Sequence, residues 1–259
     1  MLRTGVQRAG MTRFMLILPV ALIVTLMTIP PSLFAAESDD ETGFEDYIRQ
    51  MQAVYDTVSN YTCTFYKRER VNDTLLPRER IFMKFRKPFS IYMRWKGDAH
   101  AGQEALFVRG KYNDKMIAHK GSFPDITMRV DPTGRLAMRR NRHPITEAGI
   151  GATIEDIVND YHRARANPED SVTYEDLGYQ EIYGHRCHCF RIRVPEQHES
   201  EYYGPLSEVC ISKESKLPVR LRIWNSDGKL IEDYGYTDLD LNPGLTSKEF
   251  DPDNPSYDF

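Results

Sequence analysis

The sequence lacks the short motifs by which common enzyme classes are recognised. It has no Gly-x-Ser-x-Gly elbow, no His-Glu-x-x-His helix and no glycine-rich phosphate loop. It also lacks an excess of positive charge: the formal net charge is -4, which argues against a nucleic-acid-binding protein. Carboxylates are plentiful, but no pair stands out as acid and base. We therefore predict a protein that is not an enzyme and needs no cofactor, with a carboxylate site assembled from distant strands as the alternative.

The N-terminal segment has the three parts of a secretory signal peptide. Three arginines precede an apolar run over residues 14–29, and small residues follow at Ala35 and Ala36. No cysteine lies near this junction, which excludes lipoprotein acylation there. We predict that residues 1–36 are a signal peptide and that residues 37–259 form one domain in the periplasm or another exported location. Retention of the segment as an uncleaved anchor is the alternative.

Cysteine is scarce, but its even number matters in an oxidising compartment. Cys63, Cys187, Cys189 and Cys210 are disulfide candidates with three possible connectivities. Direct pairing of Cys187 with Cys189 has poor geometry, whereas a bridge from either of them to Cys210 across neighbouring strands is easier to build. A zinc site that includes His185 is the alternative. We predict disulfides and no metal.

The stretch over residues 67–121 shows the period-two alternation of an antiparallel sheet with one apolar face and one mostly basic face. The apolar positions of two neighbouring runs are Ile81, Met83 and Phe85, then Ile91, Met93 and Trp95. Charge is distributed unevenly: residues 61–121 hold 14 Lys and Arg against 6 Asp and Glu, and residues 196–259 hold 6 against 14. Either two solvated faces of the sheet carry opposite signs, or the basic face meets an anionic lipid or acidic partner.

Two helices are predicted beside these strands. Apolar residues at helical spacing indicate a first helix over residues 44–59, with Thr42 as N-cap and Glu45 completing a capping box. A second helix is predicted from Thr153 to about Ala166. The first helix is expected to lie on the apolar face of the sheet.

A further hairpin is predicted from a strong turn sequence, Asp-Pro-Thr-Gly at residues 131–134. It would pair residues 126–130 with residues 135–138. Helix, strands, a helical insertion and more strands indicate an α+β fold. We expect a strongly curved antiparallel sheet that approximates an incomplete barrel, with helices on one face.

Several segments carry a family resemblance: KRER at 67–70, KFRKPFSIY at 84–92, GQEALF at 102–107, DPTG at 131–134 and RHPI at 142–145. They resemble an uncharacterised bacterial family, the domain of unknown function fifteen-seventy-one, over roughly residues 44–259. The strand order and the ending at residues 241–252 are also similar to the periplasmic lipoprotein carrier LolA and its relatives. This similarity implies a LolA-like, eleven-stranded half-barrel, whose helices cover the concave face and enclose a hydrophobic cavity that receives acyl chains.

Methionine is common where β-branched residues would be usual. Five of the ten methionines fall in predicted strands, namely Met83, Met93, Met116, Met128 and Met138. Flexible, polarisable methionine suits a surface that contacts varied apolar ligands. We predict these lipid-binding residues: Met83, Phe85, Met93, Trp95, Phe107 and Met116. Ordinary core packing beneath the first helix is the alternative.

The densest basic cluster is Arg139, Arg140 and Arg142, which we predict to contact a lipid head group or a partner, since arginine matches phosphate oxygens. A solvated loop is the alternative. We therefore expect an exported protein that holds lipid acyl chains or a lipidated partner, does not bind nucleic acid, and has an oligomeric state that the sequence leaves open. The alternative is an envelope protein–protein interaction or sensor module with a filled core and no lipid cargo.

Overall fold

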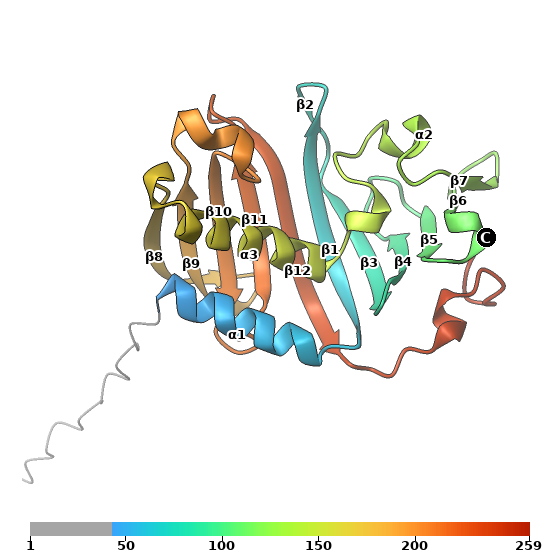
Figure 1. The fold of residues 1–259 in the computed structure, drawn as a ribbon. Helices are drawn as coiled ribbons and strands as arrows, with labels where there is room; N and C mark the ends of the chain where they lie inside the picture. Colours follow the sequence, from blue (N-terminus) through green and yellow to red (C-terminus); the bar gives the residue numbers. More distant parts are fainter. Residues whose placement is uncertain (1–42) are drawn as a thin grey trace, which may run out of the picture. The chain divides into compact units, whose positions relative to one another are not determined.

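The computed structural model describes residues 43–259, which form a large, curved, open antiparallel sheet with helices on one face (Figure 1). The strand order is β7-β6-β5-β4-β3-β1-β12-β11-β10-β9-β8, and the short β2 pairs with β1. The predicted α+β half-barrel is therefore confirmed. The predicted signal peptide lies outside the described residues. Within residues 43–259 no helix is both long enough and apolar enough to cross a membrane.

The strands of the first half of the sheet have the bounds β1 Asn60–Val71, β2 Thr74–Leu75, β3 Glu79–Arg86, β4 Ser90–Trp95, β5 Glu104–Val108, β6 Met116–His119 and β7 Thr127–Val130. The strands of the second half are β8 Thr173–Ile182, β9 His185–Arg193, β10 Leu206–Ser212, β11 Pro218–Trp224 and β12 Leu230–Leu241. β1 pairs with β3 on one side and with β12 on the other. The two halves of the chain thus meet in the middle of one sheet.

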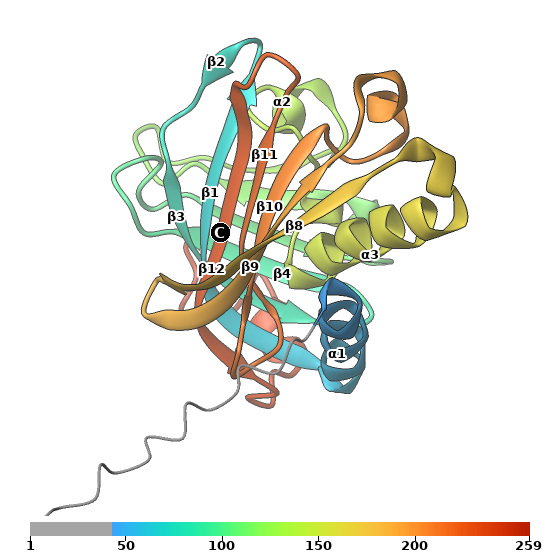
Figure 2. The same cartoon turned by 90° about the vertical axis from the view of Figure 1, so that its left-hand side faces the viewer.

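Two long helices lie side by side on the concave face (Figure 2): α1 (Phe44–Thr57) and α3 (Ile150–Ala166). α1 buries the expected stripe, including Phe44, Ile48 and Met51, because apolar residues at helical spacing form one face. Its N-cap is Gly43, and no side chain caps it. The predicted cap, Thr42, lies outside the described residues.

α3 begins three residues earlier than predicted, at Ile150. Gly149 precedes it with φ 113°, a conformation that favours glycine, and a Cβ there would lie 2.6 Å from the Tyr61 hydroxyl. That hydroxyl accepts a hydrogen bond from the Ile150 N–H at 3.0 Å. Thr153 is consequently an interior residue of the helix, where it hydrogen-bonds the Tyr236 hydroxyl at 2.9 Å.

The predicted hairpin after β7 is wrong. β7 pairs with β6, and residues 135–138 form the short helix α2 (Arg135–Met138). The turn itself forms, since the Asp131 carboxylate accepts hydrogen bonds from the N–H and the hydroxyl of Thr133 at 3.1 and 2.9 Å. Gly134 then becomes an N-cap, and the Arg-Leu-Ala-Met sequence that follows has a higher preference for helix than for strand. Met138 is therefore in a helix.

Buried apolar residues form a core on each face of the sheet, and a third, small cluster contains Cys187, Val219 and the disulfide. The main core joins α1 and α3 to the inner face, and a smaller one lies on the outer face around Tyr92, Leu106 and Phe250. The short 3-10 helices are η1 Tyr112–Asp114, η2 Ile145–Glu147, η3 Pro168–Asp170, η4 Glu196–Glu201 and η5 Ser247–Phe250. η5 belongs to the C-terminal tail, residues 242–259, which packs on the outer face of β4 and β5.

Candidate functional site

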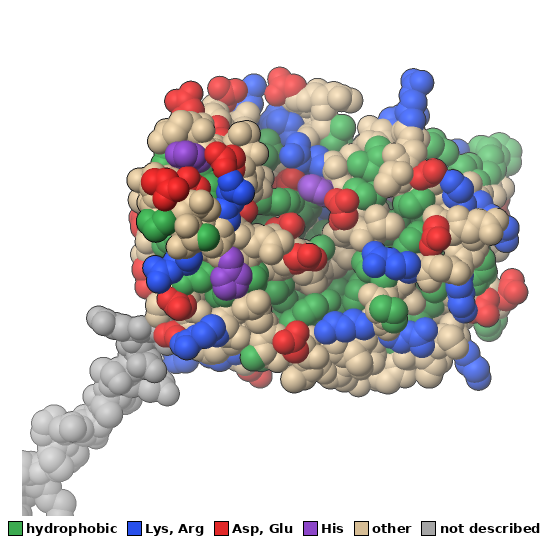
Figure 3. Space-filling view, viewed as in Figure 1, with side chains coloured by type: hydrophobic (Ala, Val, Ile, Leu, Met, Phe, Trp, Pro, Cys, Tyr) green, Lys and Arg blue, Asp and Glu red, His purple; other side chains and the backbone are tan. Residues whose placement is uncertain are grey.

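A cavity of about 1570 Å³ opens between the inner face of the first half of the sheet and a segment that crosses over it. We name this segment, residues 131–149, the cover segment; it contains α2 and η2. The space-filling view shows the molecule hollowed beside this segment, with hydrophobic side chains inside (Figure 3). The cavity is larger than the roughly 300–1,000 Å³ of ordinary small-molecule sites.

The predicted lipid-binding residues divide into two groups. Phe85, Met93, Trp95 and Met116 line the cavity. Met83 (0 % exposed) and Phe107 (2 % exposed) are not part of its wall and pack in the main core. Whether any of these residues contacts a ligand stays a prediction.

The predicted basic cluster also divides. Arg139 and Arg140 line the cavity. Arg142 points elsewhere: its Nε donates to Glu232 Oε1 at 2.6 Å. A guanidinium already bound to a buried carboxylate has less charge to offer a ligand. Only the first two arginines therefore keep the geometry expected of a head-group site.

Buried carboxylates form a polar cluster at one end of the cavity, and sequence reasoning missed them. Glu69, Glu79 and Glu232 are 3 %, 6 % and 1 % exposed. Glu69 accepts from the Tyr234 hydroxyl at 2.5 Å and from the Arg142 backbone N–H at 2.9 Å. Because Glu69 and Glu232 face each other on β1 and β12, they hold the cover segment from two adjacent strands.

Glu79 belongs to the same end of the cavity. Its carboxylate accepts from the Trp95 indole N–H at 2.8 Å, and the Lys67 ammonium lies 3.5 Å from it. Lys67 also lies 3.7 Å from Glu69 and donates to Asn141 of the cover segment. One lysine therefore offsets part of the charge of two carboxylates and contacts the cover segment.

Glu232 is the best-connected of these carboxylates. Besides Arg142, it accepts from the Tyr203 hydroxyl at 2.6 Å and lies 3.1 Å from His143 Nε2. Burial opposes ionisation of Glu232, but the hydrogen bonds from His143, Tyr203 and Arg142 outweigh it and lower the pKa of this carboxyl. The hydrogen bond to Glu232 raises the pKa of His143 against the opposing effect of its burial. The pair is thus favoured in its charged form.

Asp156 of α3 faces the same cavity from the other side. Burial raises its pKa to about 7, with further contributions from Asp160 and Glu232, although His143 opposes the shift. A carboxyl that titrates near neutrality beside a large cavity is a candidate functional group. The cavity is consequently apolar where Phe85, Met93 and Met116 line it and polar where Glu69, Glu79 and Asp156 gather, an arrangement suited to an amphipathic ligand.

A signal for this polar cluster is present in the sequence. Tyr61, Cys63 and Phe65 alternate on the inner face of β1, and the same alternation continues to Lys67 and Glu69. Charged residues at positions that the alternation assigns to the interior are rare unless they are paired. Extending the period-two rule past Phe65 would have placed Lys67 and Glu69 on the inner face, but it could not have identified their partners on other strands.

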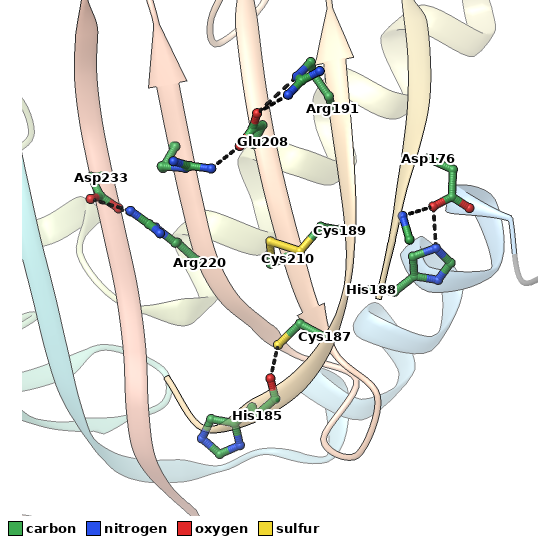
Figure 4. The surroundings of a disulfide bond; sticks show 12 residues. Asp176, His185, Cys187, His188, Cys189, Arg191, Glu208, Cys210, Arg220 and Asp233 are labelled. Carbon is green, nitrogen blue, oxygen red and sulfur yellow. Dashed lines mark hydrogen bonds and ion pairs between the residues drawn. A yellow bond between two sulfur atoms is a disulfide. The ribbon is translucent and has the colours of Figure 1, made fainter. Parts of the chain in front are cut away.

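None of the four cysteines is part of the cavity wall. Cys189 and Cys210 form a disulfide between β9 and β10, while Cys63 and Cys187 are free and buried (Figure 4). The bridge to Cys210 is therefore the expected one, and the zinc alternative loses two of its ligands. Within residues 43–259, Asp170, His198 and Glu201 bring ligand atoms within 4.8 Å of one another. Asp170 accepts from Tyr202, and Glu201 from Arg163, so ion pairs and hydrogen bonds already account for this group.

A family model described as protein of unknown function (DUF1571) matches residues 58–259. The chain belongs to this family. The predicted family is thereby confirmed over most of the chain, although the description of DUF1571 assigns no activity. No curated protein matches the sequence.

Solved structures share parts of this DUF1571 architecture. The Mycobacterium tuberculosis lipoprotein LppX is 14% identical, with a TM-score of 0.45 over 77% of this chain and 95% of that one. A LolA superfamily protein from Nitrosomonas europaea is 9% identical, with a TM-score of 0.34 over 80% of this chain and 96% of that one.

A MucA–MucB complex of Pseudomonas aeruginosa is also similar. It is 14% identical with a TM-score of 0.44, covering 80% of this chain and 59% of that chain. This chain thus spans less than two thirds of that one. The TM-scores of these three structures all lie below 0.5.

Proposed function

We propose that this protein is a non-enzymatic, exported binder of lipid acyl chains or of a lipidated partner. The observation that supports this is the cavity of about 1570 Å³, whose floor carries Phe85, Met93, Trp95 and Met116. Burying acyl chains against such a surface contributes about 0.8 kcal/mol per methylene. The ligand's polar end would lie beside the Lys67 and Glu79 side of the cavity, where polar groups are already gathered.

Lipid extraction and mass spectrometry on protein purified from its own envelope test this proposal. We expect a co-purifying lipid, and uptake of a fluorescent fatty acid once that lipid is removed. Protein that carries no lipid and takes up no fatty acid would refute the proposal.

A cavity-filling variant makes the test specific. Ala118→Trp places an indole in the cavity, because Ala118 lines it from β6. Excluding about two methylenes of the ligand should weaken fatty-acid binding about tenfold. Ala53→Trp is the matched control, since Ala53 is exposed on α1. Equal binding by the two variants would place the ligand outside this cavity.

A further inference from the structure

The large exposed apolar side chains of the described chain all come from one short segment. Phe123 is 94 % exposed, Leu136 56 %, and Ile126 and Met128 39 % each. Phe123 and Ile126 precede β7, Met128 lies on this edge strand, and Leu136 is on α2. We name these four residues the mouth patch. Exposed apolar groups gathered in one place mark an interaction surface more often than scattered ones do.

The mouth patch is continuous with the cavity. Ile126, Met128 and Leu136 line the cavity as well as being exposed to solvent. Met128 faces Ala118 of β6, whose side chain is on the cavity wall. These apolar side chains therefore form a continuous path from the molecular surface at β7 into the cavity.

Positive charge surrounds this opening. Residues 109–142 contain nine Lys and Arg against three Asp, a net charge of +6. Lys120, Arg139 and Arg140 line the same cavity as the mouth patch. Among residues 43–259 the guanidinium groups of Arg139 and Arg140 form no ion pair, in contrast to Arg142. Figure 3 shows lysine and arginine side chains beside hydrophobic ones on this side of the molecule.

The shape and charge of this surface favour a bilayer over a protein strand. β7 is an edge strand of only four residues, and the exposed Arg129 lies within it. A short, charged edge opposes the addition of another strand. Projecting apolar side chains with a basic surround instead match an interface with anionic lipid, where the apolar groups enter the acyl region and the cations remain near head groups.

We propose that the mouth patch docks on the surface of an anionic lipid bilayer. Phe123 and Leu136 enter the bilayer, while Lys120, Arg139 and Arg140 contact lipid phosphates. Docking in this position brings the opening of the cavity against the membrane, so that acyl chains pass between bilayer and cavity without crossing water. The passage of acyl chains into the cavity rests on the lipid-binding function proposed above, whereas the docking itself does not.

Vesicle partition of the protein purified with its natural N-terminus tests the docking. Vesicles of phosphatidylcholine with and without phosphatidylglycerol are the probes. Phe123→Asp should weaken partition about tenfold on phosphatidylglycerol vesicles, since it removes most of one buried aromatic side chain. Arg139→Glu should weaken it about tenfold on the same vesicles and have little effect on neutral ones. Arg165→Glu, an exposed arginine of α3, is the matched control.

Insertion depth gives a second, independent measurement. Phe123→Trp should show fluorescence quenching by brominated acyl chains beyond that of the parent protein, which has Trp95 and Trp224. Ala53→Trp on α1 should show no quenching beyond that of the parent protein. Quenching equal to that of the parent, or partition unchanged by Phe123→Asp, would overturn the proposal.

Two further outcomes distinguish membrane docking from self-association and from the proposed lipid-binding function. Self-association that Phe123→Asp abolishes, with no effect on vesicle partition, would assign the patch to a second copy of the chain and overturn membrane docking. Ala118→Trp should reduce fatty-acid uptake and leave vesicle partition intact. If vesicles bind through the mouth patch but no variant takes up fatty acid, the docking holds and the lipid-binding function fails.

Discussion

Both halves of the sheet alternate apolar and polar residues along their strands, but their apolar inner faces are packed differently. The inner face of β8–β11 is covered by α1 and α3, and a pocket between α3 and the sheet there measures about 20 Å³, room for about one water molecule. The inner face of β3–β7 meets the cover segment instead and retains about 1570 Å³. We call these the filled half and the open half. The inner face is therefore filled in one half of the sheet and borders a cavity in the other.

The outer faces differ as well. In the filled half, ion pairs cross the strands around the disulfide: Arg191 and Arg222 both bind Glu208, and Arg220 binds Asp233 (Figure 4). These pairs link neighbouring strands on the outer face.

In the open half, the C-terminal tail covers the outer face. Tyr257 stacks on Tyr92 with ring centroids 3.9 Å apart, and Asp258 binds Arg94 at 3.0 Å. Phe250 lies 2 % exposed beneath the Arg86 guanidinium. The acidic partner of the basic face thus includes the chain's own tail. The C-terminal tail therefore stabilises the open half by contacts with its outer face, and these contacts do not occupy the inner face that lines the cavity.

Matched methionines test the contrast most directly. Met51→Ala in the filled half should lower the free energy of unfolding by about 4 kcal/mol, because a closed void is left at a fully buried site. Met93→Ala in the open half should cost only about 1–2 kcal/mol, since the deleted atoms border an existing cavity. Urea unfolding of both variants provides the measurement. Equal costs would show that the open half is closed in solution.

The disulfide tests whether the filled half is braced independently of the cavity. Cys189 and Cys210 are 21 residues apart. Cys210→Ser combined with Cys189→Ser should lower the free energy of unfolding by about 3 kcal/mol through the entropy of the unfolded chain. Fatty-acid uptake at a temperature where the variant stays folded should be unchanged. A loss of uptake in the folded variant would show that the two halves are coupled.

Asp156 tests the boundary between the halves, because it borders both the large cavity and the small space under α3. Burial raises the pKa of this carboxyl to about 7, so the folded state holds its proton more tightly than the unfolded chain. Stability should therefore fall as pH rises from about 4 to about 7, by on the order of 1 kcal/mol once solvent screening of this partly exposed carboxyl is allowed for. Asp156→Asn should reduce this slope.

Urea unfolding at a series of pH values measures the effect. Glu169→Gln, at an exposed position of η3, is the control. A slope unchanged by Asp156→Asn would assign the titration to another group. Three other groups of this cluster titrate in or near this range. Burial raises the pKa of Asp160 to about 6, so Asp160 adds to the same slope. The raised pKa of His143 contributes stability that is lost at higher pH, and the lowered pKa of Glu232 contributes stability that is lost at lower pH.

Local patterns in the sequence predicted much of this structure. Alternation along β3 and β4 assigned Met93 and Trp95 to the inner face, and helical spacing located α1. Local chemistry failed at residues 131–138, where a strong turn sequence suggested a hairpin and led into α2 instead. It also missed Glu69 and Glu232, because their roles depend on pairing between β1 and β12, about 160 residues apart in the chain.

The sequence alone determined which side chains share a face, since the periods of strands and helices are properties of neighbouring residues. It also determined that cysteines on neighbouring strands could be joined. Only the tertiary structure decided what covers each face. Coverage depends on where distant segments return: α3 lies over one half of the sheet, the cover segment spans the other, and residues 242–259 lie behind it. Those contacts form between parts of the chain that no local pattern relates, and they decide that one half is filled while the other holds a cavity.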